Sequence, residues 1–252
     1  MNSCVHMKLG IMTNIIGLDK VKKIIEGHGE LLCLCVTGSK AYGLANSESD
    51  DDIAGVYKAP TSQIISIYGT PQETIHKANV EGQPDFTIHE VGKFIKLAAS
   101  GNPAIIELFF LDSLVENEIW KTIKENYPIF LSTNIRRSYG GYALQQLHKK
   151  KLREEQGMEG YSPKTRYRDK KHTRHIIRLF IQQRQILETG KITPMLTKEQ
   201  IDFCLEAQDW DSKQVEEWMN KETLELLKIN NNLRPEPDYQ KINELIIDIR
   251  GL

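Results

Sequence analysis

The sequence predicts an α+β fold, in which a small sheet flanked by helices precedes a helical C-terminal region. Three short segments before residue 90 have the features of strands, whereas apolar residues from Ile119 onward recur mostly at helical spacing. We therefore expect a first domain at residues 1–115 and a helical domain at residues 116–252, with the boundary between residues 112 and 138.

The predicted strands are short apolar segments between turn residues. Glu30–Thr37 is a mostly apolar run between Gly29 and Gly38, which is typical of a buried strand. Asp52–Tyr57 is ended by Pro60, and Asp85–Ile88 alternates after a turn signal at residues 82–84.

Helices are predicted from apolar spacing and from their end signals. Glycine follows three of them, and Asn102-Pro103 has the pattern of an N-cap followed by a first-turn proline. The main predicted helices are Leu18–Glu26, Lys40–Leu44, Ile88–Ser100, Tyr142–Arg153 and Asp169–Glu188.

Charge is distributed unevenly along the chain. The formal net charge of -1 and the 27% of charged residues disfavour a globally basic nucleic-acid binder, an acidic disordered chain and a collagen-like fibre. Residues 1–135, however, carry 11 basic and 16 acidic side chains, residues 136–191 carry 15 and 5, and residues 192–252 carry 7 and 13. The basic segment at 136–191 is therefore expected to meet phosphate or nucleic acid.

The apolar runs and the cysteines indicate a cytoplasmic protein. The longest runs, such as Leu31–Val36, are far shorter than the roughly 18–20 residues of a membrane span, and residues 1–10 lack the apolar core of a signal peptide. There is no CxxC pair among Cys4, Cys33, Cys35 and Cys204. We expect these cysteines to be reduced core residues.

The segment that indicates chemistry begins where the first strand ends. Gly38-Ser39 stands at a helix start, where backbone N–H groups and a hydroxyl can hold phosphate, although alone it is more often a simple turn. Asp50 and Asp52 are two residues apart at the next strand, so both point to one face, and such a pair suits Mg²⁺. Asp51 is expected to point to the other face and to be structural or exposed. A phosphate cradle beside paired carboxylates indicates metal-assisted phosphoryl or nucleotidyl transfer.

These residues resemble a known family. The pattern G-S-x-x-Y-G followed by S-D-x-D-x-x-G-V is similar to the DNA polymerase β-like nucleotidyltransferase superfamily, and most of all to its YcgL type, the RNA-repair-associated polymerase β family. Residues 93–110 and the K-H-x-x-H-x-x-R-L pattern at Lys171–Leu179 extend the resemblance over about residues 31–195.

The resemblance implies a mixed or antiparallel sheet flanked by helices, with a third carboxylate on a later strand. Asp85 is the best match for this carboxylate, and Glu90 and Glu107 are the alternatives. Together with Asp50 and Asp52, it would be catalytic and would bind two Mg²⁺ (or Mn²⁺) ions.

The implied reaction uses a nucleoside triphosphate, for which ATP is the first expectation. One metal ion would position the triphosphate and the other would lower the pKa of an attacking hydroxyl. Gly38 and Ser39 would hold the β- and γ-phosphates, and the products would be a nucleotidylated acceptor and pyrophosphate.

The helix from Asp169 has two interpretations. Lys171, His175 and Arg178 share one face, which either binds nucleotide phosphate or is simply a basic, solvated side. His172 and His175 have a spacing that can bind zinc, but no third ligand is evident. The surrounding basic and aromatic residues favour an RNA acceptor over a solvated loop that contacts only the triphosphate: Lys149, Lys150, Lys151, Tyr161, Arg166, Tyr167 and Arg168.

Three functions follow from these patterns. The first is an Mg²⁺-dependent nucleotidyltransferase acting on RNA, including tRNA. The second is nucleotidylation of a small molecule or a protein, as in antibiotic-modifying or antitoxin-like relatives. The third is an RNA-binding module without catalysis, which the intact Asp-x-Asp disfavours. Neither the transferred base nor the oligomeric state is specified by the sequence.

Overall fold

The structure is a computed structural model that describes residues 17–46, 49–67, 69, 71–78, 80, 84–155 and 163–252, with only the backbone at 163–168. Cys4, Tyr161 and the side chains of Arg166, Tyr167 and Arg168, for which the sequence made predictions, lie outside the described residues.

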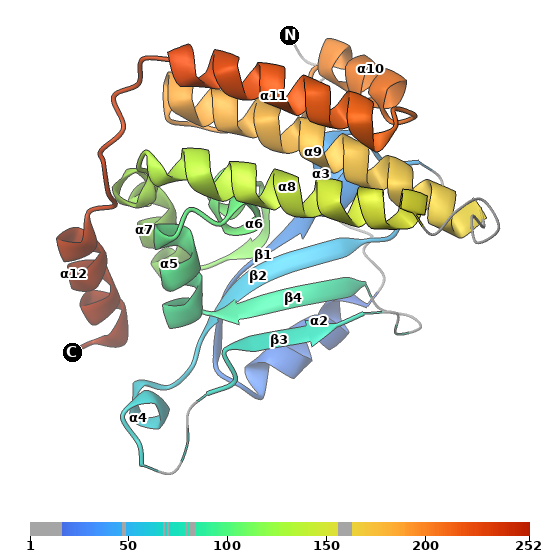
Figure 1. The fold of residues 1–252 in the computed structure, drawn as a ribbon. Coiled ribbons are helices and arrows are strands. Elements are labelled where there is room, and N and C mark those ends of the chain that lie inside the picture. Colours follow the sequence, from blue (N-terminus) through green and yellow to red (C-terminus); the bar gives the residue numbers. More distant parts are fainter. Residues whose placement is uncertain are drawn as a thin grey trace, which may run out of the picture. The chain divides into compact units, whose positions relative to one another are not determined.

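The strands form a five-stranded mixed sheet with the order β3-β4-β2-β1-β5 (Figure 1). Strands β2 and β4 are parallel, and the other neighbouring strands are antiparallel. The strands are β1 (Glu30–Thr37), β2 (Asp52–Lys58), β3 (Thr74–Lys77), β4 (Asp85–Glu90) and β5 (Ser113–Glu116). The predicted α+β class, with a mixed sheet, flanking helices and a helical C-terminal region, is confirmed.

Helices and short 3₁₀ turns connect and follow these strands (Figure 1). Helix α8 begins eight residues earlier than predicted, and helix α9 six residues earlier. The helical elements are α2 (Leu18–Glu26), α3 (Gly38–Tyr42), α4 (Thr61–Ile64), α5 (Val91–Ala99), α6 (Pro103–Ile106), η1 (Glu107–Phe109), α7 (Glu118–Glu125), η2 (Tyr127–Phe130), α8 (Asn134–Glu155), α9 (Pro163–Thr189), α10 (Lys198–Ala207), α11 (Ser212–Lys228) and α12 (Tyr239–Arg250).

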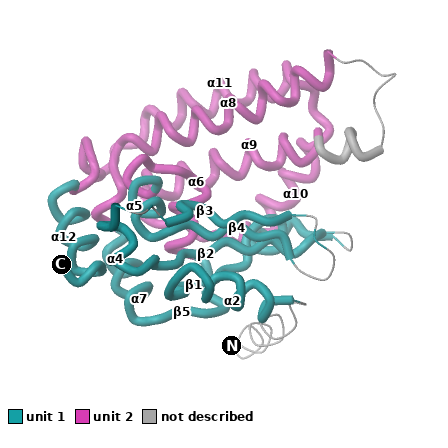
Figure 2. Tube along the Cα trace, turned by 90° about the horizontal axis from the view of Figure 1, so that it is seen from below, with its two compact units in different colours: residues 1–97, 111–127, 239–252 teal, residues 98–110, 128–238 magenta. Residues whose placement is uncertain are grey.

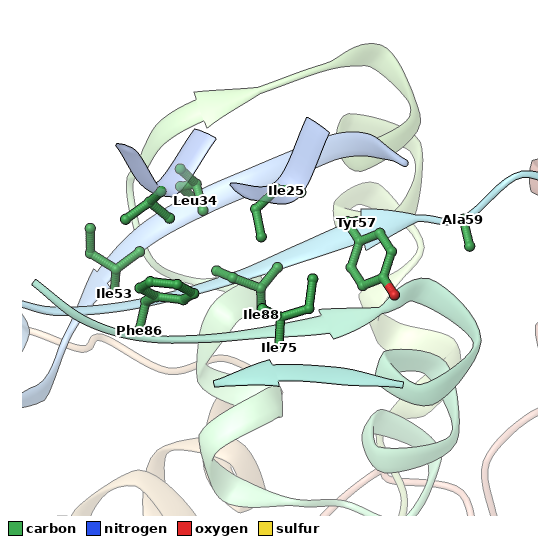
Figure 3. Close-up of a cluster of buried hydrophobic side chains, with 9 residues drawn as sticks. Ile25, Leu34, Ile53, Tyr57, Ala59, Ile75, Phe86 and Ile88 are labelled. Atoms are coloured by element: carbon green, nitrogen blue, oxygen red, sulfur yellow. The ribbon is translucent and has the colours of Figure 1, made fainter. Parts of the chain in front are cut away.

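One face of the sheet is covered by helix α2, and the side chains between them form a hydrophobic core (Figure 3). On β2 and β4, the residues that point into this core are an even number of positions apart, as strand geometry requires. The core residues are Val21, Ile25, Leu34, Ile53, Tyr57, Ala59, Ile75, Phe86 and Ile88. Because Ile53 and Phe86 point to this face, Asp52 and Asp85, which precede them, point to the opposite face.

The chain divides into two compact units, and both are discontinuous in sequence (Figure 2). Unit 1 comprises residues 1–97, 111–127 and 239–252, and unit 2 comprises residues 98–110 and 128–238. Compactness does not show whether residues 1–115 and 116–252 fold independently, so the domain boundary at residue 115 stays a prediction.

Helix α12 belongs to unit 1, although it is remote from the sheet in sequence. The Arg250 guanidinium donates to the Ala59 carbonyl at 3.1 Å and to Glu90 Oε1 at 2.7 Å. The Thr61 hydroxyl donates to the Arg250 carbonyl at 2.8 Å. These contacts attach α12 to the ends of β2 and β4.

Unit 2 is a helical assembly in which α8, α9 and α11 run side by side (Figure 1). Phe180, Phe203, Trp210 and Trp218 form an aromatic cluster with ring centroids 5.2–6.4 Å apart. The two tryptophans, both half-buried, therefore pack together within this unit.

The described helices and cysteines bear on the membrane and thiol predictions. Within those ranges, no helix is both long enough and apolar enough to cross a membrane. Cys33, Cys35 and Cys204 are buried free thiols.

Candidate active site

Two carboxylates meet at one end of the sheet of unit 1. Asp52 is the first residue of β2 and Asp85 is the first residue of β4, and the two are paired in the parallel register. Paired residues of neighbouring strands point to the same face, so both side chains lie on the face opposite α2. Both residues are half-buried.

Gly38 lies directly against Asp52. Its φ of +67° is in the left-handed region, and a Cβ placed on it would be 2.1 Å from Oδ2 of Asp52. Thr37, the residue before Gly38, is the register partner of Asp52 across the β1–β2 ladder. Only glycine satisfies both the backbone conformation and this close approach. The Gly38-Ser39 start of α3 is therefore beside the carboxylate pair.

Asp51 links three parts of this edge. The Lys40 ammonium donates to Asp51 Oδ1 at 2.6 Å, which joins α3 to the start of β2. The Asp51 carbonyl accepts from the Asp85 N–H at 3.0 Å. The structure thus gives Asp51 structural contacts, which is one of the two roles expected for it.

Asp50 is exposed, one residue outside this linkage. Ser49, which precedes it, is bonded to Asn46 through both backbone and side chain at 2.9–3.1 Å. In the described ranges, no group of three or more His, Cys, Asp or Glu side chains is placed to hold a metal ion.

The donor chemistry nevertheless fits magnesium. Mg²⁺ in nucleotide sites is bound by one or two carboxylates together with substrate phosphates and water. Asp52 and Asp85 supply such a pair, and Asp50 is a further carboxylate nearby in sequence. The three-carboxylate site and its role stay a prediction.

The two alternatives for the third carboxylate are used in buried ion pairs. Glu90 pairs with Arg250 in unit 1, and its Oε2 also accepts from the Gly92 N–H at 2.7 Å. Glu107 pairs with Arg178 in unit 2 at 2.7 Å, with both side chains at most 5% exposed. These contacts favour structural roles for both glutamates.

The predicted nucleotide-binding residues of α9 lie in unit 2 and differ in exposure. Lys171 is exposed, His175 is half-buried and Arg178 is buried. Besides Glu107, Arg178 donates to Gln182 Oε1 at 3.0 Å and lies 3.2 Å from His175 Nδ1. Their assignment to a nucleotide stays a prediction, and Lys171 is the most accessible of the three.

Both histidines of α9 are held in the neutral form. Burial, with the nearby cations of Arg153 and Lys149, lowers the pKa of His172 to about 4. Burial and the Arg178 charge lower the pKa of His175 well below its usual value. His172 Nδ1 lies 2.6 Å from Gln146 Oε1, so the helix α8 side chain orients this ring.

The basic segment is partly neutralised by the acidic tail of the same unit. Its ion pairs with that tail join Lys151 to Glu216 at 2.8 Å, Lys170 to Asp209 at 2.7 Å and Arg184 to Glu222 at 2.9 Å. Lys150, also expected at an RNA surface, is instead buried in a pair with Asp169. Lys149 remains exposed.

Comparison with known proteins decides the family. The family model described as the RNA repair pathway DNA polymerase beta family matches residues 15–248, which is nearly the whole chain. The chain belongs to the RNA repair pathway DNA polymerase beta family. It is accordingly a nucleotidyltransferase, and the match extends well beyond the resemblance over residues 31–195 seen in the sequence motifs.

Other comparisons add little to this membership of the RNA repair pathway DNA polymerase beta family. No curated protein matches the chain. A crystal structure of a nucleotidyltransferase-like protein from Exiguobacterium sibiricum 255-15 is similar with 10% identity and a TM-score of 0.32, over 92% of this chain and 77% of that chain.

Proposed function

We propose that this protein transfers a nucleoside monophosphate from an NTP, with ATP as the expected donor, to a hydroxyl group of RNA, tRNA included. The observation that supports this proposal is the register of Asp52 and Asp85 on adjacent parallel strands, with Gly38 against Asp52. Membership of an RNA repair family supports RNA as the acceptor.

In this proposal the metal ligands are Asp50, Asp52 and Asp85. Bound Mg²⁺ (or Mn²⁺) would supply neutralisation of the triphosphate charge and a lower pKa for the attacking hydroxyl. Gly38 and Ser39 would direct backbone N–H groups and a hydroxyl to the β- and γ-phosphates. The acceptor oxygen would form the new bond to the α-phosphorus as the bond to pyrophosphate breaks.

The three α9 residues differ in how accessible they are to a nucleotide. Exposed Lys171 is available to a phosphate group, whereas Arg178 already holds Glu107 and Gln182. We therefore assign phosphate contact to Lys171 first, and a supporting position behind it to His175 and Arg178.

The reduced thiols of Cys33 and Cys35 suit a cytoplasmic location, which is part of this proposal.

The proposal predicts that Asp50→Ala and Asp52→Ala each abolish Mg²⁺-dependent transfer while the fold is retained. The loss should be roughly 100-fold or more, because even residues that only support metal ligands contribute about 10–100-fold. Each purified variant would be incubated with labelled ATP, Mg²⁺ and total cellular RNA, and circular dichroism would check the fold. Full activity in either folded variant contradicts the proposal.

The same assay separates the acceptors. Label in RNA supports the proposal, label in protein or in a small molecule supports the second function, and no label with any of the four NTPs supports a non-catalytic role. Binding to an RNA acceptor should also weaken steeply as salt rises, because bound phosphates release counterions. A small acceptor should show little salt dependence.

A further inference from the structure

We infer that Asp51, through its ion pair with Lys40, is a positioning residue that holds the phosphate-binding turn in register with the paired carboxylates. This inference rests on the proposed function, and it concerns a residue that contacts neither NTP nor metal in that proposal. Asp51 stands in the chain between two of the proposed metal ligands, Asp50 and Asp52.

The side chain of Asp51 reaches the helix that carries Gly38 and Ser39. Lys40 Nζ is 2.6 Å from Asp51 Oδ1, and the two side chains are 35% and 32% exposed. Helix α3 has only five residues, and Thr37 at its N-cap makes no side-chain cap hydrogen bond. So short a helix has little stability of its own, and the ion pair therefore contributes directly to its orientation.

The backbone of Asp51 reaches the other strand of the site. Its carbonyl accepts from the Asp85 N–H at 3.0 Å, at the point where β4 begins. One residue is thus joined to the turn with Gly38, to Asp52 by the peptide bond, and to Asp85. Substitution of the side chain would release α3 while the bond to Asp85 remains.

This division predicts a specific defect. A partly exposed ion pair contributes little to global stability. In the proposed function, however, the triphosphate is held by Gly38 and Ser39 at the start of α3, so a shift of this helix misplaces the groups that bind it. Loss of the Asp51–Lys40 pair should therefore weaken binding of the triphosphate far more than it affects unfolding.

The test compares ATP binding, in the presence of Mg²⁺ and without acceptor, for the wild type and five variants, one of them a control. Asp51→Asn and Lys40→Met should each raise the Kd for ATP about tenfold, and the double variant should be no worse than either single one. Lys40→Arg keeps the pair and should bind nearly as well as wild type. The matched control is Lys93→Met, because Lys93 has the same 35% exposure in an ion pair with Glu73 elsewhere in unit 1.

The outcomes separate this inference from the proposed function. If the wild type binds ATP, and Asp51→Asn and Lys40→Met bind it with the same Kd, the inference is overturned but the proposed function is not. Equal weakening in Lys93→Met also overturns it, because any lost ion pair would then have the same effect. Absence of ATP binding by the wild type itself overturns both. Additive losses in the double variant show that the two residues act separately, which also contradicts the inference.

Discussion

The carboxylate edge of unit 1 and the basic motif of α9 in unit 2 both match family patterns, but their side chains are used differently. Asp50 is exposed and Asp52 and Asp85 are half-buried, whereas Arg178 is buried against Glu107. One family motif thus carries exposed or half-buried carboxylates, whereas the other includes a buried ion pair. Burial distinguishes the two motifs, and sequence spacing does not.

The strongest test of this contrast is Glu107→Ala. It leaves the Arg178 charge buried without its carboxylate, so the free energy of unfolding should fall by about 3–5 kcal/mol. Urea denaturation measures this loss.

Its control is the exposed pair of Lys228 and Glu225, at 2.7 Å. Lys228→Ala should change stability by less than about 1 kcal/mol. If the two variants lose similar free energy of unfolding, the buried Arg178 pair contributes no more to the fold than an exposed pair. That result would contradict a structural role for Arg178 in the α9 motif.

A second test replaces Gly38 with alanine. The left-handed backbone at φ +67° costs a non-glycine residue about 1–2 kcal/mol, and the new Cβ would displace the Asp52 carboxylate. We expect loss of transfer activity with only this modest loss of stability, measured by activity assay and urea denaturation in parallel.

Gly140 in helix α8 is the matched control. A Cβ there meets no atom within 4 Å, so Gly140→Ala should stabilise the chain by about 0.5–1 kcal/mol and leave activity unchanged. If Gly38→Ala retains full activity, the close approach of Gly38 to Asp52 has no functional meaning.

The smallest expected effect is a pH dependence from α9. Between pH 6.5 and about 4, His172, with a pKa of about 4, takes up a proton only after unfolding, and the lowered pKa of His175 acts in the same direction. Stability should therefore fall as the pH falls through this range, by less than about 1.4 kcal/mol per pH unit for each histidine.

Unfolding in urea at several pH values measures this slope. The difference between wild type and His172→Gln isolates one histidine, since the contributions of other groups cancel. An identical slope in the two proteins would mean that His172 is not held neutral in the folded state.

Much of the sheet was predictable, because β1, β2 and β4 are mainly apolar segments next to turn residues. The four-residue strands β3 and β5 were missed because they lie at the two edges of the sheet, where neither carries an apolar run. Edge strands of this kind differ little in composition from loops.

The candidate site likewise has a part that the sequence indicates and a part that it does not. The family resemblance placed Asp85 only on a later strand than Asp52, and the structure pairs the two residues on neighbouring parallel strands. The Lys40–Asp51 pair depends on the orientation of α3, and the Glu107–Arg178 pair joins residues 71 positions apart. No local pattern encodes such contacts, although a lysine two residues after Gly38 and an aspartate between two candidate ligands were available as signals.

Helix α12 has a consequence for the order of events on the ribosome. Glu90 is synthesised 160 residues before its partner Arg250, which at ~5–20 residues per second is roughly 8–32 s. All of unit 2 is made during this interval. Synthesis of unit 1 therefore starts before that of unit 2 and ends after it. In the nascent protein, the Glu90 carboxylate lacks its Arg250 partner until helix α12 has been made.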